Sequence, residues 1–287
     1  MPELPEVETV RRGLDAVMTG RRLGTVTVNR FDLRRPIPPD FAERVSGRTV
    51  TAIARRGKYL LIEFDDDGVL IVHLGMSGRM VIDPPGATAP ETGAAAPTTA
   101  HSPHEHVVFE VGNGTMVRFS DPRRFGLMAL TDRAGLEAHP LLAHLGPEPV
   151  DDDFTGALLA GRLKGKRTPI KAALLDQRVV AGLGNIYVCE SLFKAGLSPR
   201  RIAATVQGGR AGRLAAAVRG VLADAIAAGG STLRDHVAPS GEIGYFQHSF
   251  KVYGREGAGC PTAGCGAAVR RIVQSGRSTF FCSRCQR

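Results

Sequence analysis

The sequence predicts an α+β protein with an N-terminal helix, an antiparallel β-sandwich, a second domain made of helices, and a C-terminal zinc finger. Three observations support this class. Short strand-like runs separated by turn residues fill the segment between the first helix and about residue 130. From about Asp152 the apolar residues recur at helical spacing. The tail then holds four of the five cysteines, Cys260, Cys265, Cys282 and Cys285.

The first helix is predicted from Pro2 to about Met18. Apolar residues recur there at steps of three and four: Leu4, Val7, Val10, Leu14 and Val17. Pro5 falls in the first turn, where a missing N–H leaves no helical hydrogen bond unmade. We expect the positive end of this helix to lie beside Pro2, which favours a neutral amine there once Met1 is removed.

A series of strand-like runs follows this helix, and turn signals such as Gly112-Asn113-Gly114 separate them. Many strands at short intervals are typical of an antiparallel sandwich. The pattern is interrupted at 84–103, a stretch rich in Pro, Ala and Thr that we expect to be a flexible surface insertion. The predicted strands are Thr25–Val28, Tyr59–Phe64, Val69–His73, Val107–Val111, Thr115–Phe119 and Leu127–Leu130.

The second half contains helical patterns and then the cysteine-rich tail. Asn185 follows Gly184 and is a good N-cap residue for the third predicted helix. The predicted helices are 153–163, 168–178, 185–195 and 208–228. We therefore predict a first domain over 1–134, a helical domain over 150–230 and a zinc finger over 245–287.

The overall charge favours a polyanionic partner. The net charge is +9 and the isoelectric point is near 9.7, and lysines and arginines gain affinity for nucleic acid by releasing counterions from phosphates. No long uncharged apolar run predicts a membrane span, and no signal peptide pattern is present. The clustered cysteines fit metal binding in a reducing compartment better than disulfides, which predicts a cytoplasmic protein.

Pro2 is the candidate nucleophile. Without Met1 its secondary amine can attack an electrophilic carbon and form an iminium ion, which then draws electrons from neighbouring bonds. Glu3 adjoins this amine and is the candidate for the proton transfers that such a reaction needs. Glu6, on the same helix, is either an orienting carboxylate or an ordinary helix acid.

The tail predicts one structural zinc ion. The spacing is Cys260-x4-Cys265-x16-Cys282-x2-Cys285, and two close pairs joined by a hairpin give a tetrahedral thiolate site with no open position. Cys189 stands alone on a predicted helix and is interpreted as a small buried residue. His73 is interpreted as structural and not as a metal ligand.

Several motifs together resemble bacterial formamidopyrimidine-DNA glycosylase, a glycosylase that is also a DNA-(apurinic or apyrimidinic site) lyase. The chain begins Met-Pro-Glu-Leu-Pro-Glu-Val-Glu-Thr-Val, and further matching segments follow in the family's order. These are Lys58-Tyr59-Leu60, His73 to Gly78, Asp121 to Gly126, Gly184 to Tyr187, and Gly244-Tyr245-Phe246. The family's first cysteine pair is separated by two residues, whereas four separate Cys260 and Cys265. We expect the longer spacing to widen one knuckle without removing a ligand.

The resemblance implies roles for residues near the reacting sugar. Pro2 would attack C1′, Glu3 would protonate the sugar ring oxygen, and Lys58 would assist β-elimination near a phosphate. Arg277, inside the predicted hairpin, would hold the phosphate at the lesion and assist the second elimination. The helical segment would be the family's helix–two-turn–helix DNA-binding motif.

The resemblance also implies residues that contact DNA. A damaged base must leave the stack to be reached, and the vacated space then needs an apolar wedge and a hydrogen-bonding group. Met76, Phe125 and Arg123 supply these properties. The alternative is that Met76 and Phe125 are ordinary core residues, and their glycine-flanked loops argue against burial. The basic run before the helix–two-turn–helix motif and the backbone amides near Gly182 and Gly184 suit phosphate contacts. The remaining predicted DNA-binding residues are His104, Lys166, Lys171 and Asn185.

The sequence therefore predicts an enzyme of base excision repair that acts as a monomer on damaged duplex DNA and associates with the nucleoid when bound. It would excise oxidised purines through a Schiff base at Pro2 and then cleave the strand by β,δ-elimination. Two alternatives remain: an endonuclease VIII-like glycosylase for oxidised pyrimidines, and a catalytically inactive protein that binds damaged DNA. The segment from about 231 to 244 is the expected lesion-contacting loop.

Overall fold

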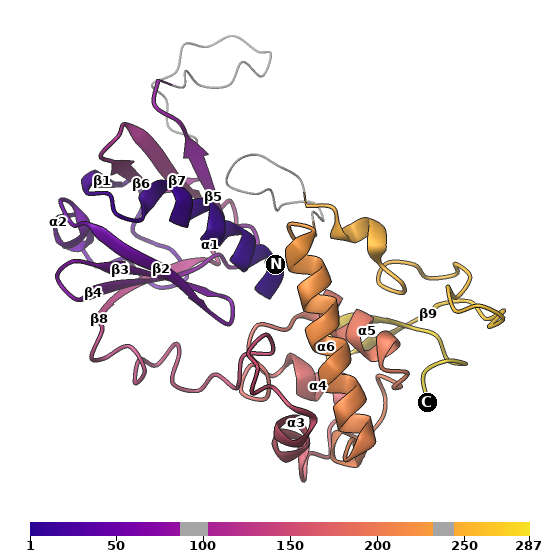
Figure 1. Cartoon of the computed structure of the whole chain (residues 1–287). Coiled ribbons are helices and arrows are strands. Elements are labelled where there is room, and N and C mark those ends of the chain that lie inside the picture. Colours follow the sequence, from indigo (N-terminus) through magenta and orange to yellow (C-terminus); the bar gives the residue numbers. More distant parts are fainter. Residues whose placement is uncertain (87–102, 232–243) are drawn as a thin grey trace. The chain divides into compact units, whose positions relative to one another are not determined.

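The protein is described by a computed structural model, which covers residues 1–86, 103–231 and 244–287 (Figure 1). Most of the insertion predicted at 84–103 and of the lesion loop predicted at 231–244 lies outside the described residues. The chain forms two compact units. The first contains Met1–Pro2 and Glu6–Leu142, and the second contains Glu3–Pro5, Ala143–Ser231 and Tyr245–Arg287. The three predicted domain ranges stay a prediction.

The first unit contains the N-terminal helix α1 (Leu4–Met18) from Glu6 onward and two four-stranded antiparallel sheets, which confirms the predicted α+β class and sandwich (Figure 1). One sheet has the order β1-β6-β7-β5 and the other has the order β2-β3-β4-β8. The strands of the first sheet are β1 (Leu23–Val28), β5 (Arg79–Asp83), β6 (Glu105–Val111) and β7 (Thr115–Ser120). Those of the second are β2 (Val50–Arg56), β3 (Tyr59–Phe64), β4 (Gly68–His73) and β8 (Leu127–Asp132), and a short helix α2 spans Phe41–Val45.

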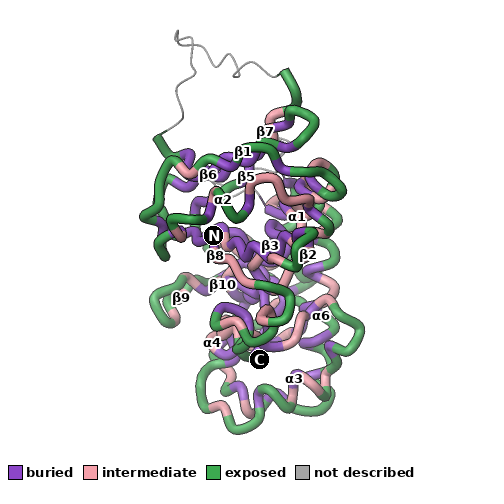
Figure 2. Tube along the Cα trace, turned by 90° about the vertical axis from the view of Figure 1, so that its left-hand side faces the viewer, coloured by how far each residue is buried: buried purple, intermediate pink, exposed green. Residues whose placement is uncertain are grey.

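The core of this unit lies between the helix and the sheets. Buried side chains of α1, among them Val7, Val10 and Leu14, pack in one cluster with apolar residues from both sheets. Figure 2 shows buried residues concentrated along the strands and exposed residues in the connecting turns. β2 and β5 were not predicted. β2 has the sequence VTAIARR, whose paired arginines and alanines give only a weak strand pattern, and β5 is five residues long.

The second unit is built from helices α3 (Gly156–Leu163), α4 (Ile170–Leu175), α5 (Asn185–Lys194) and α6 (Gly209–Ala227), with 3₁₀ turns η1 (Ala203–Thr205) and η2 (Phe246–Ser249). Their apolar faces form a second core that also includes Leu4. The predicted helix over 168–178 is reduced to six residues because Pro169 precedes it and Asp176 ends it. None of the helices in the described ranges is both long and apolar enough to cross a membrane.

The cysteine-rich tail contains a hairpin of β9 (Arg270–Gln274) and β10 (Arg277–Phe281). Gln274 pairs with Arg277, so the turn consists of Ser275 and Gly276. Both turn residues have positive φ, at 50° and 73°, as the two-residue type I′ hairpin turn requires. This turn places Arg277 at the first position of β10, where its side chain is exposed.

Candidate functional site

Glu3 is buried at the start of α5. Its carboxylate accepts hydrogen bonds from the backbone N–H groups of Ile186, at 2.9 Å, and Tyr187, at 3.4 Å. These groups belong to the first turn of α5, where backbone donors lack partners within the helix and the helix dipole favours an anion. The Asn185 N-cap prediction is therefore wrong: Gly184 occupies the cap position without a side chain, and Glu3 supplies the acceptor.

Two glycines allow residues 3 and 4 to approach this helix start. A Cβ on Gly184 would lie 2.2 Å from Cδ of Glu3, and a Cβ on Gly182 would lie 2.6 Å from Cδ1 of Leu4. Gly182 also has a φ of +83°, which side-chain-bearing residues rarely adopt. Its N–H donates to Oε1 of Gln177 at 2.9 Å. Phosphate binding by the backbone amides near Gly182 and Gly184, with the Asn185 amide, stays a prediction.

Pro2, Glu6 and Lys58 are all buried in the first unit. Pro2 directly precedes Glu3, and Glu6 lies in the first turn of α1. Lys58 lies in the two-residue turn that joins β2 to β3, after Gly57, whose φ is +58°. This hairpin is a fixed support for a buried ammonium group, because Arg55 also donates to the Gly57 carbonyl at 3.0 Å.

Lys171 is not a surface residue. Its side chain is 0% exposed, and its ammonium donates to the Ser278 carbonyl at 2.9 Å and to Oγ1 of Thr279 at 2.7 Å. The phosphate contact predicted for Lys171 is therefore wrong. Burial lowers the pKa of this lysine, and the nearby Cys189 and Glu3 partly oppose that shift.

Asn185 supports the same strand, because its side-chain amide donates to the Ser278 carbonyl at 3.0 Å. Lys171 and Asn185 thus hold β10 from the helical side, one residue beyond Arg277. Sequence patterns did not indicate this support, since the partners are about a hundred residues apart. Direct contact of Asn185 with DNA stays a prediction.

Two loops of the first unit carry the predicted wedge residues, and Asp121 ties them together. Asp121 is fully buried, accepts from the Ser77 hydroxyl at 2.6 Å and accepts from the Gly126 N–H at 2.7 Å. Ser77 in turn accepts from the Arg123 N–H at 3.2 Å. A Cβ on Gly75, whose φ is +68°, would lie 2.4 Å from the backbone of Phe125 and Gly126, so glycine is needed for this approach.

The wedge side chains themselves are exposed. Met76 is 38% exposed and Phe125 is 43% exposed, so neither is an ordinary core residue. The Arg123 guanidinium carbon lies 4.8 Å from the centre of the Phe125 ring, a cation–π arrangement. An apolar group and an arginine fork are thus presented side by side. We name Met76, Arg123 and Phe125 the wedge surface.

His73 and His104 are both hydrogen-bonded to these loops. Nδ1 of His73 accepts the Gly75 N–H at 2.9 Å, so its proton is on Nε2. Burial, reinforced by Lys58 and Arg34, lowers the pKa of His73 from 6.5 to about 4, which makes it neutral at pH 7. His104 is exposed, and its carbonyl accepts the Asp121 N–H at 2.9 Å.

Lys166, in the second unit, is half-buried just after α3.

The four tail cysteines form a metal site. Their sulfur atoms all lie within 4.8 Å of one another, and the Cys260–Cys285 and Cys265–Cys282 pairs are 3.8 Å and 3.6 Å apart. Tetrahedral Zn–S bonds of about 2.3 Å place sulfurs about 3.8 Å apart, so the residues fit one zinc ion. The four-residue spacing of the first pair removes no ligand. Cys189 is buried elsewhere, as predicted, and burial raises the pKa of its thiol to about 11.

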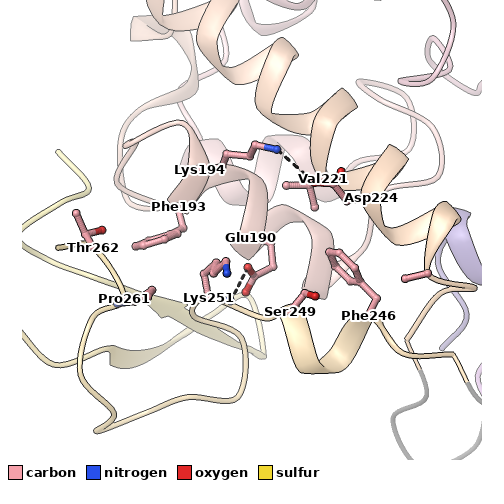
Figure 3. A pocket seen from close by; sticks show the side chains of 11 residues that line it. Glu190, Phe193, Lys194, Val221, Asp224, Phe246, Ser249, Lys251, Pro261 and Thr262 are labelled. Atoms are coloured by element: carbon pink, nitrogen blue, oxygen red, sulfur yellow. Dashed lines mark hydrogen bonds and ion pairs between the residues drawn. The ribbon is translucent and has the colours of Figure 1, made fainter.

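A cavity of about 510 Å³ opens between α5, α6 and the segment that leads into the finger (Figure 3). Glu190 lies in its wall and accepts backbone N–H groups from Lys251, Val252 and Tyr253 at 2.8–3.0 Å. Lys194 pairs with Asp224 at 3.5 Å across the rim. Because these bonds fix the segment entering the finger, Glu190 is a structural anchor that the sequence patterns missed.

Comparison with known proteins identifies the family. The model of the formamidopyrimidine-DNA glycosylase N-terminal domain matches residues 1–128, and that family's H2TH domain matches 145–237. The zinc finger found in FPG and IleRS matches 260–287. Formamidopyrimidine-DNA glycosylases of Cereibacter sphaeroides (strain ATCC 17029 / ATH 2.4.9) and Paracoccus denitrificans are 56% and 55% identical over 287 residues, covering all of both chains.

Solved structures agree along the full length. The MutM (FPG) protein of Thermus thermophilus has a TM-score of 0.83 at 39% identity, covering 99% of this chain and 98% of that one. A Lactococcus lactis FPG mutant in complex with a Fapy-dG containing DNA has a TM-score of 0.87 at 33% identity, covering 100% of both. With full-length relatives above half identity and all three domain models matched in order, this chain belongs to the formamidopyrimidine-DNA glycosylase family.

Proposed function

We propose that this chain removes oxidised purines from damaged duplex DNA by attack of the Pro2 nitrogen, with Glu3 as its proton-transfer partner. As a member of its family the chain is a DNA glycosylase for oxidised purines, and AP lyase activity is a general property of that family. The observation that supports the assignment of Glu3 most is its buried carboxylate at the start of α5, adjacent in sequence to the proposed nucleophile.

The position of Glu3 suits proton transfer. The two N–H groups and the positive end of α5 favour the ionised form of Glu3, so the carboxylate is free of a proton before the Pro2 amine loses one on attack. The same groups make protonated Glu3 a readier acid, which suits the return of that proton. As the Pro2 nitrogen bonds to C1′, Glu3 returns a proton to the sugar ring oxygen and the ring opens. The nitrogen lone pair then expels the damaged base, which leaves with the electrons of its bond to C1′ and takes up a proton from water. Nitrogen and C1′ are then joined as an iminium ion, whose charge lets a proton leave C2′.

Strand cleavage follows from that ion. Loss of the C2′ proton expels the 3′ phosphate in β-elimination, and a second proton loss expels the 5′ phosphate in δ-elimination. A one-nucleotide gap flanked by phosphates remains. We assign Lys58 to the first elimination and Arg277 to the phosphate at the lesion, with Glu6 as an orienting carboxylate.

The other residues bind or support. We assign Met76 and Phe125 to the space left by the flipped nucleotide and Arg123 to the base opposite the lesion. His104, Lys166 and Asn185 are proposed DNA contacts. Lys171 is proposed as a positioning residue, because it holds the strand that begins with Arg277. The zinc ion stabilises the finger and takes no part in the chemistry.

Damaged duplex DNA is the proposed partner. The net charge of +9 favours phosphate binding, and solved relatives are complexes with damaged DNA. We propose that the protein acts as a monomer in the bacterial cytoplasm and lies on the nucleoid when bound to DNA.

Cleavage of three matched duplexes tests the function. Each carries 8-oxoguanine, formamidopyrimidine or thymine glycol opposite its normal partner, and products are separated on a denaturing gel. We expect the two purine lesions to be cleaved faster than thymine glycol. Faster cleavage of thymine glycol would favour an endonuclease VIII-like enzyme. Tight binding of all three without cleavage would indicate an inactive binding protein.

A further inference from the structure

A second exposed group of charges lies beside the wedge surface, on the loop between β1 and α2. This loop, residues 29–37, presents Arg34 and Arg35 to solvent. None of the roles assigned above uses it. We name residues 29–37 the arginine loop.

The arginine loop is held rigidly. Leu33 and Ile37 are buried in the core of the first unit on either side of the two arginines. The Ile37 N–H donates to the Phe31 carbonyl at 2.9 Å, and Asp32 pairs with Pro36 in an isolated bridge. A loop with fixed ends and a closed backbone presents its side chains at little conformational cost, which favours binding.

This loop is attached directly to the loop that carries Arg123 and Phe125. The Arg34 N–H donates to the Gly126 carbonyl at 3.2 Å. Asp32 pairs with Arg124 at 2.5 Å, and Arg124 has a φ of +56°, which is unusual for a side-chain-bearing residue. The main chain of Arg34 is therefore one hydrogen bond from the residue that follows Phe125.

Arg34 and Arg35 have no carboxylate partner among the described residues, whereas Arg30 and Arg124 both pair with Asp32. The positive charges of Arg34 and Arg35 also influence the pKa values of neighbouring residues. Burial chiefly raises the pKa of Tyr59, and Arg34 and Arg35 oppose that shift; Arg34 contributes to the lowered pKa of His73. Arg34 is thus close enough to influence the strand ends beside Lys58.

We propose that Arg34 and Arg35 each bind a backbone phosphate of the duplex next to the wedge surface. This rests on the proposed function, since it assumes that Arg123 and Phe125 enter the duplex. A guanidinium fork matches a phosphate, and exposed unpaired arginines lose no internal ion pair on binding. Because the loop is bonded to the backbone beside Phe125, these phosphate contacts fix the depth and angle at which the wedge surface meets the DNA.

The test measures affinity across a salt series. Full-length zinc-loaded protein is titrated with a duplex that carries a tetrahydrofuran abasic analogue opposite cytosine. Arg34→Ala and Arg35→Ala are compared with Arg44→Ala, which removes an exposed arginine of α2 from the same unit. We expect each loop variant to bind several-fold more weakly and to make the negative slope of log affinity against log salt less steep by about one. Arg44→Ala should keep the affinity and the slope of the wild type.

Lysine variants test whether an effect comes from the lost charge or from misfolding. Arg34→Lys and Arg35→Lys keep the charge, so their salt slopes should stay near that of the wild type. Slopes and affinities of both alanine variants equal to those of Arg44→Ala would overturn the inference. If the wild type cleaves no lesion but the two alanine variants still show the expected loss of salt slope, the proposed function is contradicted and the phosphate contacts are supported.

Discussion

The start of α5 and the wedge surface differ in the exposure of their functional side chains to solvent. At α5, Glu3 is 3% exposed and its oxygens face backbone donors of the protein. On the wedge surface, Met76, Arg123 and Phe125 face outward, and the bonds that fix them lie beneath, at Asp121. A proton-transfer group needs a preorganised environment with little water, whereas groups that read DNA must stay accessible until DNA arrives. The difference predicts that changes at α5 alter chemistry and changes on the wedge surface alter recognition.

Glu3→Gln should give the largest effect. Glutamine keeps the shape and one acceptor oxygen for the α5 amides, but it cannot take up and return a proton. We expect base excision to slow by about 10²–10⁴-fold. Single-turnover kinetics on an 8-oxoguanine duplex measure the rate, and titration with the tetrahydrofuran duplex should show nearly unchanged affinity. If Glu3 only caps α5, the rate will hardly change and the melting temperature will fall instead.

Replacing His73 tests how a buried neutral histidine beneath the wedge surface makes stability depend on pH. Its folded pKa is about 4 and its unfolded value is 6.5, so the unfolded state binds more protons between these values. Stability should therefore fall as pH drops from about 6.5 to about 4, by at most about 3 kcal/mol, and level off below. Urea unfolding of wild type and His73→Gln across this range measures it. Exposed His248 supplies the control, His248→Gln, which should keep the wild-type pH dependence.

Arg123→Ala should affect recognition and leave the chemical groups intact. Arginine offers paired donors to acceptors on cytosine, so the wild type should prefer lesions opposite cytosine to lesions opposite adenine. We expect the substitution to reduce that preference by about 1–3 kcal/mol. Rates on the two duplexes, measured with the same lesion, give the comparison. A preference equal to that of the wild type would move the base-reading role away from the wedge surface.

Arg277→Ala should have the smallest effect, because its side chain is exposed on a hairpin that the zinc site and Lys171 hold in place. The negative slope of log affinity against log salt should become less steep by about one unit, because one phosphate contact is lost. The product mixture should shift toward the β-elimination species. A denaturing gel separates the two products. Unaltered slope and product ratio together would place Arg277 among the solvated charges.

The sequence predicted what depends on local pattern. The α1 periodicity, the apolar strands β3 and β4 and the four cysteines are visible in short windows, so the α+β class and the zinc site were predicted correctly. What it missed depends on contacts between distant residues. Nothing near Asn185 indicates that Glu3 caps α5, and nothing near Lys171 indicates that Ser278 and Thr279 enclose its ammonium.

The most direct test concerns the nucleophile. Borohydride reduces an iminium between protein and DNA to a stable amine, so it traps the proposed intermediate on an 8-oxoguanine duplex. We predict that peptide mapping places the adduct on the Pro2 nitrogen, and that protein retaining Met1, whose Pro2 nitrogen is an amide, traps nothing. An adduct mapped to Lys58 or any other lysine, or full trapping with Met1 in place, would contradict the account.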